Sequence, residues 1–388
     1  MRSGNGRRHL TLLVCLVLLV VLQAVGGSSL RNLSNNSGAS LFPAMALSQN
    51  NIYLVWEDGT PGNSEIYFVR SADGGQTFSS PQNLSNSPGR SRNPAIAVSG
   101  SDVYIVWDDD TLGNFEIFYI VSRDGGQSFS QPQNLSQNAG RSVLPDIAVS
   151  ENNIYLVWQD DALGNPEIFY VRSTDGGQSF TASLNLSQNL GRSWSPVVAA
   201  EGKKVYVVWD DNTPGNREIF YAQSSDGAAS FSTPKNISNS SSFSAAPAIA
   251  VSGSRVYLAW TEELTTENYE IFYAWSSDGG SSFTLPQNIS KSPTYSGLSV
   301  IAALGDEMHV AWIEGIVIQK NGKPYVDYEA FYKRKASDGS ESVSPQNLSS
   351  SEGVTATPAI ALSGSNIYVA FADDTPGNFE IFLYISPK

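Results

Sequence analysis

The residues that could do chemistry in this chain are carboxylates in short, recurring clusters. Each cluster follows a run rich in Val, Ile, Tyr and Trp and precedes a Gly-Asn-x-Glu segment; the clusters are Glu57-Asp58, Asp108 to Asp110, Asp160-Asp161, Asp210-Asp211 and Asp373-Asp374. Ca²⁺ takes six to eight oxygen ligands, so one interpretation is a calcium site built from Asp108, Asp109, Asp110, Asp210 and Asp211. The other is structural: Asp and Asn cap turns, and the repeated Glu pairs with a neighbouring arginine or a backbone N–H.

A second group of candidates consists of residues that break the repetition. Trp194 and Tyr295 are aromatic residues without counterparts in the other repeats, and the segment 314–327 is longer than its counterparts and carries Lys320, Lys323 and Tyr325. Because a specific ligand needs an asymmetric surface, we predict that these five residues form a ligand-binding patch. The alternative is a tolerated surface insertion.

Composition excludes several classes of site and partner. The formal charge is −14, which argues against nucleic acid as a partner. The single cysteine, Cys15, lies in an N-terminal apolar run, so the remaining chain has no disulfide and no thiolate site. The single histidine outside that region, His309, falls where other repeats have tyrosine, and we expect a strand residue there.

The N-terminal segment 1–27 has the composition of an export signal. Arg2, Arg7 and Arg8 precede an apolar run from Leu10 to Val25, and small residues follow it. We therefore expect a secreted or cell-surface protein formed by residues 28–388, with an uncleaved membrane anchor as the alternative.

These features sit on a repeat of about 51 residues. It is marked by a tryptophan-type residue in each unit, at Trp56, Trp107, Trp158, Trp209, Trp260, Trp312 and Phe371. An Asn-Leu-Ser or Asn-Ile-Ser triplet and a glutamate keep the same period. We interpret the triplets as turns, with N-glycan acceptors as the alternative.

Each unit is predicted to contain four short strands. In the second unit these are 94–99, 102–107, 115–122 and 128–134, separated by turn residues, and no helical period is present. Four strands repeated at this spacing predict an all-β, seven-bladed propeller of four-stranded antiparallel blades. The seventh unit stops after its third strand, so we expect the N-terminal strand, within residues 28–34, to complete the last blade.

The turn between the third and fourth strands carries a recognisable motif, Ser-x-Asp-Gly-Gly-x-Ser/Thr-Phe. Clear copies are 71–78, 122–129, 173–180 and 276–283, with variant copies around Asp226 and Asp338. The motif resembles the Asp-box, or bacterial neuraminidase repeat, of sialidases and related propellers. The resemblance implies a propeller; the sialidases are six-bladed, whereas this chain has seven units.

The resemblance also implies the catalytic residues of sialidases: three arginines for the substrate carboxylate, a Tyr/Glu nucleophile pair and an Asp acid/base. Arg92, in Ser91-Arg92-Asn93-Pro94, is the nearest match to the first arginine, and the other two have no counterparts. Because the Glu-Ile-Phe-Tyr segment recurs between units, its carboxylate and phenol are interpreted as structural. We therefore expect a non-catalytic propeller that binds an extracellular protein or carbohydrate, with a sialidase-like exo-glycoside hydrolase as the alternative.

Overall fold

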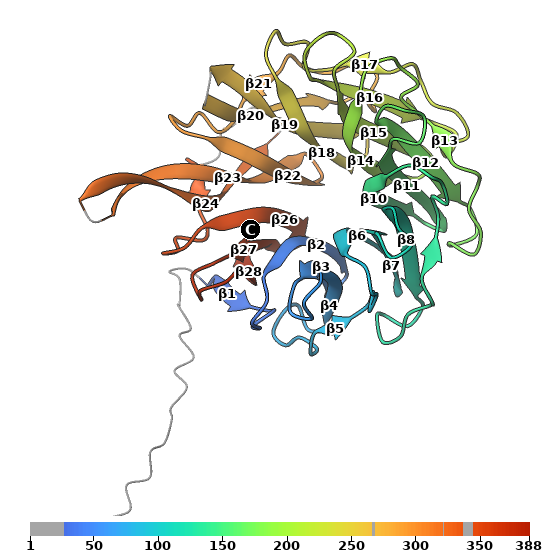
Figure 1. Ribbon diagram of the computed structural model, residues 1–388. Helices are drawn as coiled ribbons and strands as arrows, with labels where there is room; N and C mark the ends of the chain where they lie inside the picture. Colours follow the sequence, from blue (N-terminus) through green and yellow to red (C-terminus); the bar gives the residue numbers. More distant parts are fainter. Residues whose placement is uncertain (1–26, 266–267, 321, 337–343) are drawn as a thin grey trace, which may run out of the picture.

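The computed structural model describes residues 27–265, 268–320, 322–336 and 344–388. In these residues the chain forms seven four-stranded antiparallel sheets arranged around a common axis (Figure 1). The predicted seven-bladed propeller is confirmed. Apart from Gly27, the predicted export signal lies outside the described residues. No described segment forms a helix with the length and apolar character that a membrane span requires.

Each blade has an inner strand at the axis, two middle strands and an outer strand. The inner strands are β2 (Ser40–Ser48), β6 (Ser91–Ser99), β10 (Ser142–Ser150), β14 (Ser193–Glu201), β18 (Ser244–Ser252), β22 (Ser296–Leu304) and β26 (Thr355–Leu362). The second strands are β3 (Asn51–Asp58), β7 (Asp102–Asp109), β11 (Asn153–Asp160), β15 (Lys204–Asp211), β19 (Arg255–Thr265), β23 (Glu307–Lys320) and β27 (Asn366–Asp373).

The third strands are β4 (Glu65–Ser71), β8 (Glu116–Ser122), β12 (Glu167–Ser173), β16 (Glu218–Ser224), β20 (Asn268–Ser276), β24 (Lys323–Ala336) and β28 (Glu380–Pro387). The outer strands are β5 (Gln82–Asn83), β9 (Gln133–Asn134), β13 (Leu184–Asn185), β17 (Lys235–Asn236), β21 (Gln287–Asn288), β25 (Gln346–Asn347) and β1 (Ser29–Asn32). We number the blades by inner strand, from blade 1 (β2) to blade 7 (β26).

The N-terminal strand closes the ring as the sequence predicts. β1 pairs with β28 from Ser29 opposite Ile385 to Asn32 opposite Phe382. The closure continues beyond β1, since Leu33 N donates to the Ile381 carbonyl at 2.7 Å and Ile381 N donates to Ser34 Oγ at 2.8 Å. Blade 7 therefore has no unpaired outer edge at β28.

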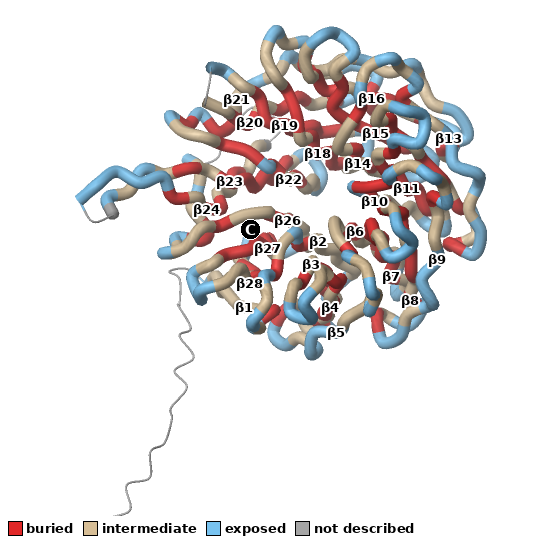
Figure 2. The backbone as a smooth tube through the Cα atoms, viewed as in Figure 1, coloured by how far each residue is buried: buried red, intermediate tan, exposed pale blue. Residues whose placement is uncertain are grey.

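The core lies between neighbouring blades, and the repeated tryptophans are its largest side chains. Trp158 is fully buried and stacks on Phe169 of its own blade, with ring centroids 6.1 Å apart. Buried residues follow the two middle strands of the blades around the ring (Figure 2). The prediction that the tryptophans form an inter-blade core is confirmed.

The predicted bounds of the blade 2 strands were wrong by one to five residues, most clearly for the inner and outer strands. The inner strand of blade 2 begins at Ser91 rather than residue 94. A β-bulge interrupts its pairing with β7 between Arg92 and Ala95, and Ser91 and Arg92 pair with β7 before the bulge. The outer strand is only Gln133–Asn134, so Phe129 lies in the preceding loop. The long segment 314–327 of blade 6 extends the β23–β24 hairpin.

The Asp-box turns hold their own shape by local hydrogen bonds. Asp124 Oδ1 accepts from Ser122 Oγ at 2.7 Å and from Ser128 N at 2.9 Å, while Gly126 N donates to Ser122 Oγ at 2.8 Å. The aromatic residue of the motif reaches a different blade: the Phe129 ring meets Phe68 of blade 1 edge-on, with centroids 5.2 Å apart. The motif thus closes a turn and joins two blades.

Candidate binding surface

The repeated glutamates are part of the frame. Glu116 is buried and accepts hydrogen bonds from Ser136 Oγ, from Asn114 Nδ2 at 2.9 Å and from Asn138 N at 3.2 Å. Ser136 belongs to the Asn-Leu-Ser triplet and also accepts from Ile117 N at 2.9 Å. The structural interpretation of the glutamates and triplets is thus supported, but hydroxyl, amide and backbone donors replace the expected arginine.

The acidic clusters are also largely occupied by hydrogen bonds. Asp109 accepts from Ser91 Oγ at 2.7 Å and from Thr111 N at 2.8 Å, and Asp211 accepts from the corresponding Ser193 Oγ and Thr213 N. Within the described residues, no group of three or more His, Cys, Asp or Glu side chains is placed to hold a metal ion. The calcium hypothesis therefore gains no ligand cluster here, and its test is still a calcium-dependent rise in melting temperature.

Two register positions carry the asymmetry of the molecule. Both lie on the face where second strands lead to third strands and outer strands lead to inner strands, which we call the loop face. The pre-serine position directly precedes the inner-strand Ser or Thr and is occupied in blades 1 to 7 by Ala39, Arg90, Arg141, Arg192, Phe243, Tyr295 and Val354. The pre-glutamate position directly precedes the repeated Glu and is occupied by Ser64, Phe115, Pro166, Arg217, Tyr269, Tyr328 and Phe379.

Backbone hydrogen bonds place these two positions side by side around the ring. The pre-glutamate carbonyl of one blade accepts the N–H of the inner-strand serine of the next blade, as in Ser142 N to the Phe115 carbonyl at 2.8 Å. The pre-serine carbonyl accepts an N–H from the second strand of its own blade or the loop after it, as in Gly315 N to the Tyr295 carbonyl at 2.8 Å. Side chains at the two positions therefore interleave from blade to blade.

On blades 5 and 6 four interleaved rings form a continuous series, which we call the aromatic arc. Ring centroids are 6.5 Å apart for Phe243 and Tyr269, 5.8 Å for Tyr269 and Tyr295, and 5.9 Å for Tyr295 and Tyr328. Each of these four rings is half-buried. The arc therefore presents apolar ring surface with hydroxyl groups at the loop face.

A glycine makes room for the Tyr295 side chain within the arc. A methyl group at Gly297 would overlap the Tyr295 ring, and Gly315 pairs across the hairpin with Tyr328. Thr294 Oγ1 also donates to the Gly315 carbonyl, which fixes the Tyr295 loop to β23.

The arc continues into blade 4 through a guanidinium group. Arg217 lies over the rings of Trp194 and Phe243, at 4.2 and 5.2 Å from their centroids. Its Nε donates to Asp210 Oδ2 at 2.7 Å. Burial raises the pKa of Asp210 to about 6, and the Arg217 charge opposes that rise. Trp194 is thereby joined to the tyrosines of blades 5 and 6.

On blades 2 and 3 the same face carries a cluster of arginines, which we call the arginine cluster. The guanidinium carbons of Arg92, Arg90 and Arg141 lie 4.1, 5.3 and 5.4 Å from the centroid of the Phe115 ring. Arg90 is paired with Asp110, and Arg92 Nε is 3.7 Å from Asp108 Oδ1. Two of the three guanidinium groups therefore already lie near a carboxylate, and Arg141 adds a third cation at the same ring.

Asp108 has a structural role in addition to its contact with Arg92. Its Oδ2 accepts from Asn93 Nδ2 at 2.7 Å and from Leu144 N at 3.1 Å. Leu144 has φ 53°, so this carboxylate satisfies the N–H of a left-handed bulge residue in the next blade. Burial raises the pKa of Asp108 to about 6.

The structure brings together two of the five predicted ligand-binding residues. Tyr295 belongs to the arc, and Trp194 is joined to it through Arg217. Lys323 and Tyr325, in contrast, are exposed and lie toward the tip of the β23–β24 hairpin. Lys320 is in β23, but its side chain lies outside the described residues. Sequence reasoning missed Arg217, Phe243, Tyr269 and Tyr328, which an alignment of the seven units at the two register positions could have found.

Comparisons with known proteins place the fold but not the family. No protein-family model matches the chain. No curated protein matches it either. Solved structures do match, among them a polysaccharide lyase of family PL25, an ulvan lyase bound to -[GlcA(1-4)Rha3S]-, with a TM-score of 0.62 and 12% identity over 92% of this chain and 96% of the lyase.

Two further matches have the same general shape. The endosialidase of phage phi92 has a TM-score of 0.56 and 12% identity, covering 93% of this chain and 69% of that protein. A protein of unknown function from Dyadobacter fermentans has a TM-score of 0.56 and 14% identity over 92% of this chain and 98% of its own. At such identities the likeness establishes a shared fold alone.

Proposed function

We propose that this protein is an exported, non-catalytic propeller that binds an acidic extracellular glycan across its loop face. The observation that carries the proposal is the change of residue type around one ring of positions. The pre-serine position is arginine in blades 2, 3 and 4 and aromatic in blades 5 and 6. A sugar chain lying along this path would stack on the aromatic arc and place a carboxylate or sulfate near the arginine cluster.

The named neighbours support a carbohydrate as the ligand class. One is a polysaccharide lyase bound to -[GlcA(1-4)Rha3S]-, and another is an endosialidase. The overall charge of this chain is −14, so an anionic ligand requires a local cationic surface, which the arginine cluster supplies. The asymmetry of the two register positions would give the ligand a direction.

The test is a binding assay with two oligosaccharides of equal length, an oligogalacturonate and a neutral oligoglucan. Tyr295→Ala is expected to weaken both ligands about tenfold, because it removes a stacking surface. Arg141→Ala should weaken only the uronate and reduce the salt dependence of its binding. Arg255→Ala is the matched control, since Arg255 lies over Trp275 at the start of β19, at the opposite end of its blade from the arc.

Equal binding of the parent and Tyr295→Ala would overturn the proposed stacking path. Failure of Arg141→Ala to distinguish the uronate from the neutral glucan would remove the acidic specificity. In either case the melting temperatures of the variants show whether the fold is intact.

A sialidase-like exo-glycoside hydrolase is the second candidate, and one observation favours it. Asp108 has a pKa of about 6 and lies beside Arg92, and in the described residues Arg92 Nε and Asp108 Oδ1 are buried without a hydrogen-bond partner. A carboxyl group with a raised pKa beside an arginine is a candidate for a functional site. Hydrolysis of a fluorogenic sialoside that is lost in Arg92→Ala would favour this candidate over the binding function.

A further inference from the structure

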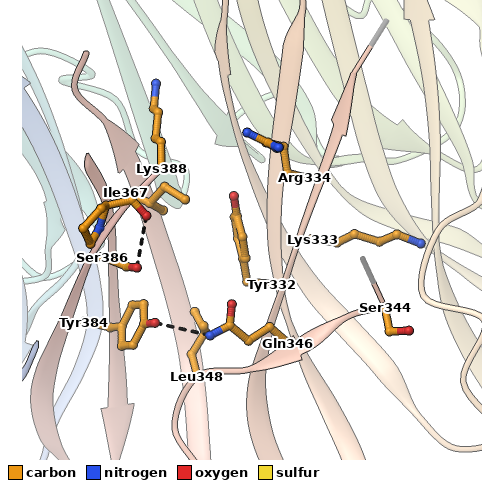
Figure 3. A pocket seen from close by; sticks show the side chains of 11 residues that line it. Tyr332, Lys333, Arg334, Ser344, Gln346, Leu348, Ile367, Tyr384, Ser386 and Lys388 are labelled. Carbon is orange, nitrogen blue, oxygen red and sulfur yellow. Dashed lines mark hydrogen bonds between the residues drawn. The ribbon is translucent and has the colours of Figure 1, made fainter. Parts of the chain in front are cut away.

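The junction between blades 6 and 7 contains a crevice of about 280 Å³. Figure 3 shows Tyr332 and Arg334 of β24 on one side, and Ile367, Tyr384 and Lys388 on the other. Gln346 Nε2 donates to Tyr384 Oη at 3.3 Å across this junction. The crevice lies at the Asp-box end of the blades, away from the loop face.

The other junctions show what occupies this position elsewhere. At four of them in the described residues, the Asp-box phenylalanine of one blade meets an aromatic ring on the third strand of the preceding blade edge-on, with centroids 5.0–5.2 Å apart. The pairs are Phe129 on Phe68, Phe180 on Tyr119, Phe231 on Tyr170 and Phe283 on Tyr221.

A second contact accompanies these ring pairs. Arg70 Nη1 donates to the Gly125 carbonyl at 2.8 Å, and Arg172 Nη1 donates to the Gly227 carbonyl at 2.7 Å. Each arginine lies on the third strand, and each glycine belongs to the Asp-box turn of the next blade. The Asp-box turn of one blade therefore contacts one aromatic ring on the third strand of the preceding blade. Where that strand also carries an arginine, as at Arg70 and Arg172, the turn accepts a hydrogen bond from the guanidinium group.

The third strand of blade 6 has the same two contact residues, an aromatic ring and an arginine, facing blade 7. Tyr332 and Arg334 follow Glu329 at the spacing with which Tyr170 and Arg172 follow Glu167. The outer strand of blade 7 is β1, so no turn joins it to β28 within the sheet. Tyr332 is accordingly half-buried, whereas the five aromatic residues at this position in blades 1 to 5 are buried: Phe68, Tyr119, Tyr170, Tyr221 and Tyr273.

Two further residues at the crevice correspond to residues at the junctions where an Asp-box turn packs on the preceding blade. Ile367 occupies the position of Ile52 and Ile154, which lie beneath the second glycine of their own Asp-box turns. Behind Tyr332, the buried His309 replaces the usual tyrosine, and its Nδ1 lies 2.7 Å from Tyr332 Oη. This contact orients the ring toward the crevice.

We propose that this crevice is a docking site for a turn of another protein that carries a phenylalanine. The phenylalanine would meet Tyr332 edge-on, and a main-chain carbonyl of the turn would accept a hydrogen bond from Arg334. Lys388 lines the same crevice and would complement an acidic residue in the turn, as in an Asp-box. The Asp-box phenylalanines of blades 1 to 5 already pack against the hydrophobic core, so none of these five rings is available to fill the crevice.

The test uses a synthetic peptide with the sequence of residues 122–129, SRDGGQSF, capped at both ends and labelled for fluorescence anisotropy. The peptide is expected to bind saturably to the full protein. Replacing its phenylalanine by alanine should weaken binding about tenfold or more, because the apolar contact is lost. Arg334→Ala should weaken binding about two- to tenfold, the range for one hydrogen bond.

Arg172→Ala is the matched control, because it removes the same contact at a junction that is already filled; it should leave peptide affinity unchanged. Equal binding of the phenylalanine and alanine peptides, or of the parent and Arg334→Ala proteins, would overturn the proposal. So would equal binding of N-acetylphenylalanine amide, which would indicate a site for small aromatic molecules. Self-association broken by Arg334→Ala would instead assign the crevice to a second copy. None of these results depends on the glycan site.

Discussion

The repeated carboxylate network and the aromatic arc lie on the same face of the propeller but differ in distribution. The glutamates at Glu116 and its counterparts recur in all seven blades, and each is buried among hydroxyl, amide or backbone donors. The arc occupies only blades 5 and 6, and its tyrosines are half-buried. In this molecule, the repeated carboxylates build the blades, and the unrepeated rings of the arc form the surface that we propose as the ligand-binding site.

The largest expected effect on stability comes from deleting the N-terminal strand that closes the ring. Deleting residues 28–34 removes β1 together with Ser34, the hydroxyl that serves Glu380 and Ile381. We expect loss of the cooperative unfolding transition or aggregation, because β28 becomes an open edge. Differential scanning calorimetry checks this, and an unchanged melting temperature would contradict the role of β1 in closure.

Alanine substitutions of two tryptophans distinguish a residue that holds the blades together from a residue at the proposed binding surface. Trp158→Ala should destabilise the fold by about 3–5 kcal/mol, because the side chain is fully buried between blades. Trp194→Ala should cost about 1 kcal/mol or less, since this ring is half-buried at the loop face, but it should weaken glycan binding. Urea denaturation measures both, and equal destabilisation would break the distinction between frame and surface.

A pH titration sharpens the comparison at Asp108. Burial raises its pKa to about 6, so the folded state holds a proton that the unfolded chain has lost, and stability falls as pH rises from about 4 to 6. Asp108→Asn does not titrate. Relative to the parent, its stability should rise by up to about 3 kcal/mol across that interval. Parallel stability curves for the parent and Asp108→Asn would contradict this.

The smallest expected effect, with the opposite sign, is at the Asp-box. Hydrogen bonds from Ser128 and Ser122 lower the pKa of Asp124, so this group stabilises the fold above its ordinary pKa and loses that contribution as pH falls. Asp124→Asn should be slightly less stable than the parent at pH 7, and the difference should disappear on acidification. A difference that grows below pH 4 would contradict the assigned sign.

Sequence reasoning succeeded where the structure is set by neighbouring residues along the chain. Glycine and aspartate in the turn of residues 122–129 predict its local hydrogen bonds, and the alternation of Val, Tyr and Trp predicts the second strand. Reasoning failed for Phe129, expected in the outer strand, because the ring packs on Phe68 of the preceding blade instead. That contact joins residues about 60 positions apart and is not encoded in local periodicity.

The sequence by itself determined seven units, their all-β character and the N-terminal completion of the last blade. These follow from short-range periodicity and from a count of strands. Only the tertiary structure decided that Arg90, Arg92 and Arg141 surround Phe115, that Tyr295 lies between Tyr269 and Tyr328, and that Tyr332 faces a crevice. Each of these arrangements depends on the register between neighbouring blades, which hydrogen bonds across the ring fix and local sequence does not.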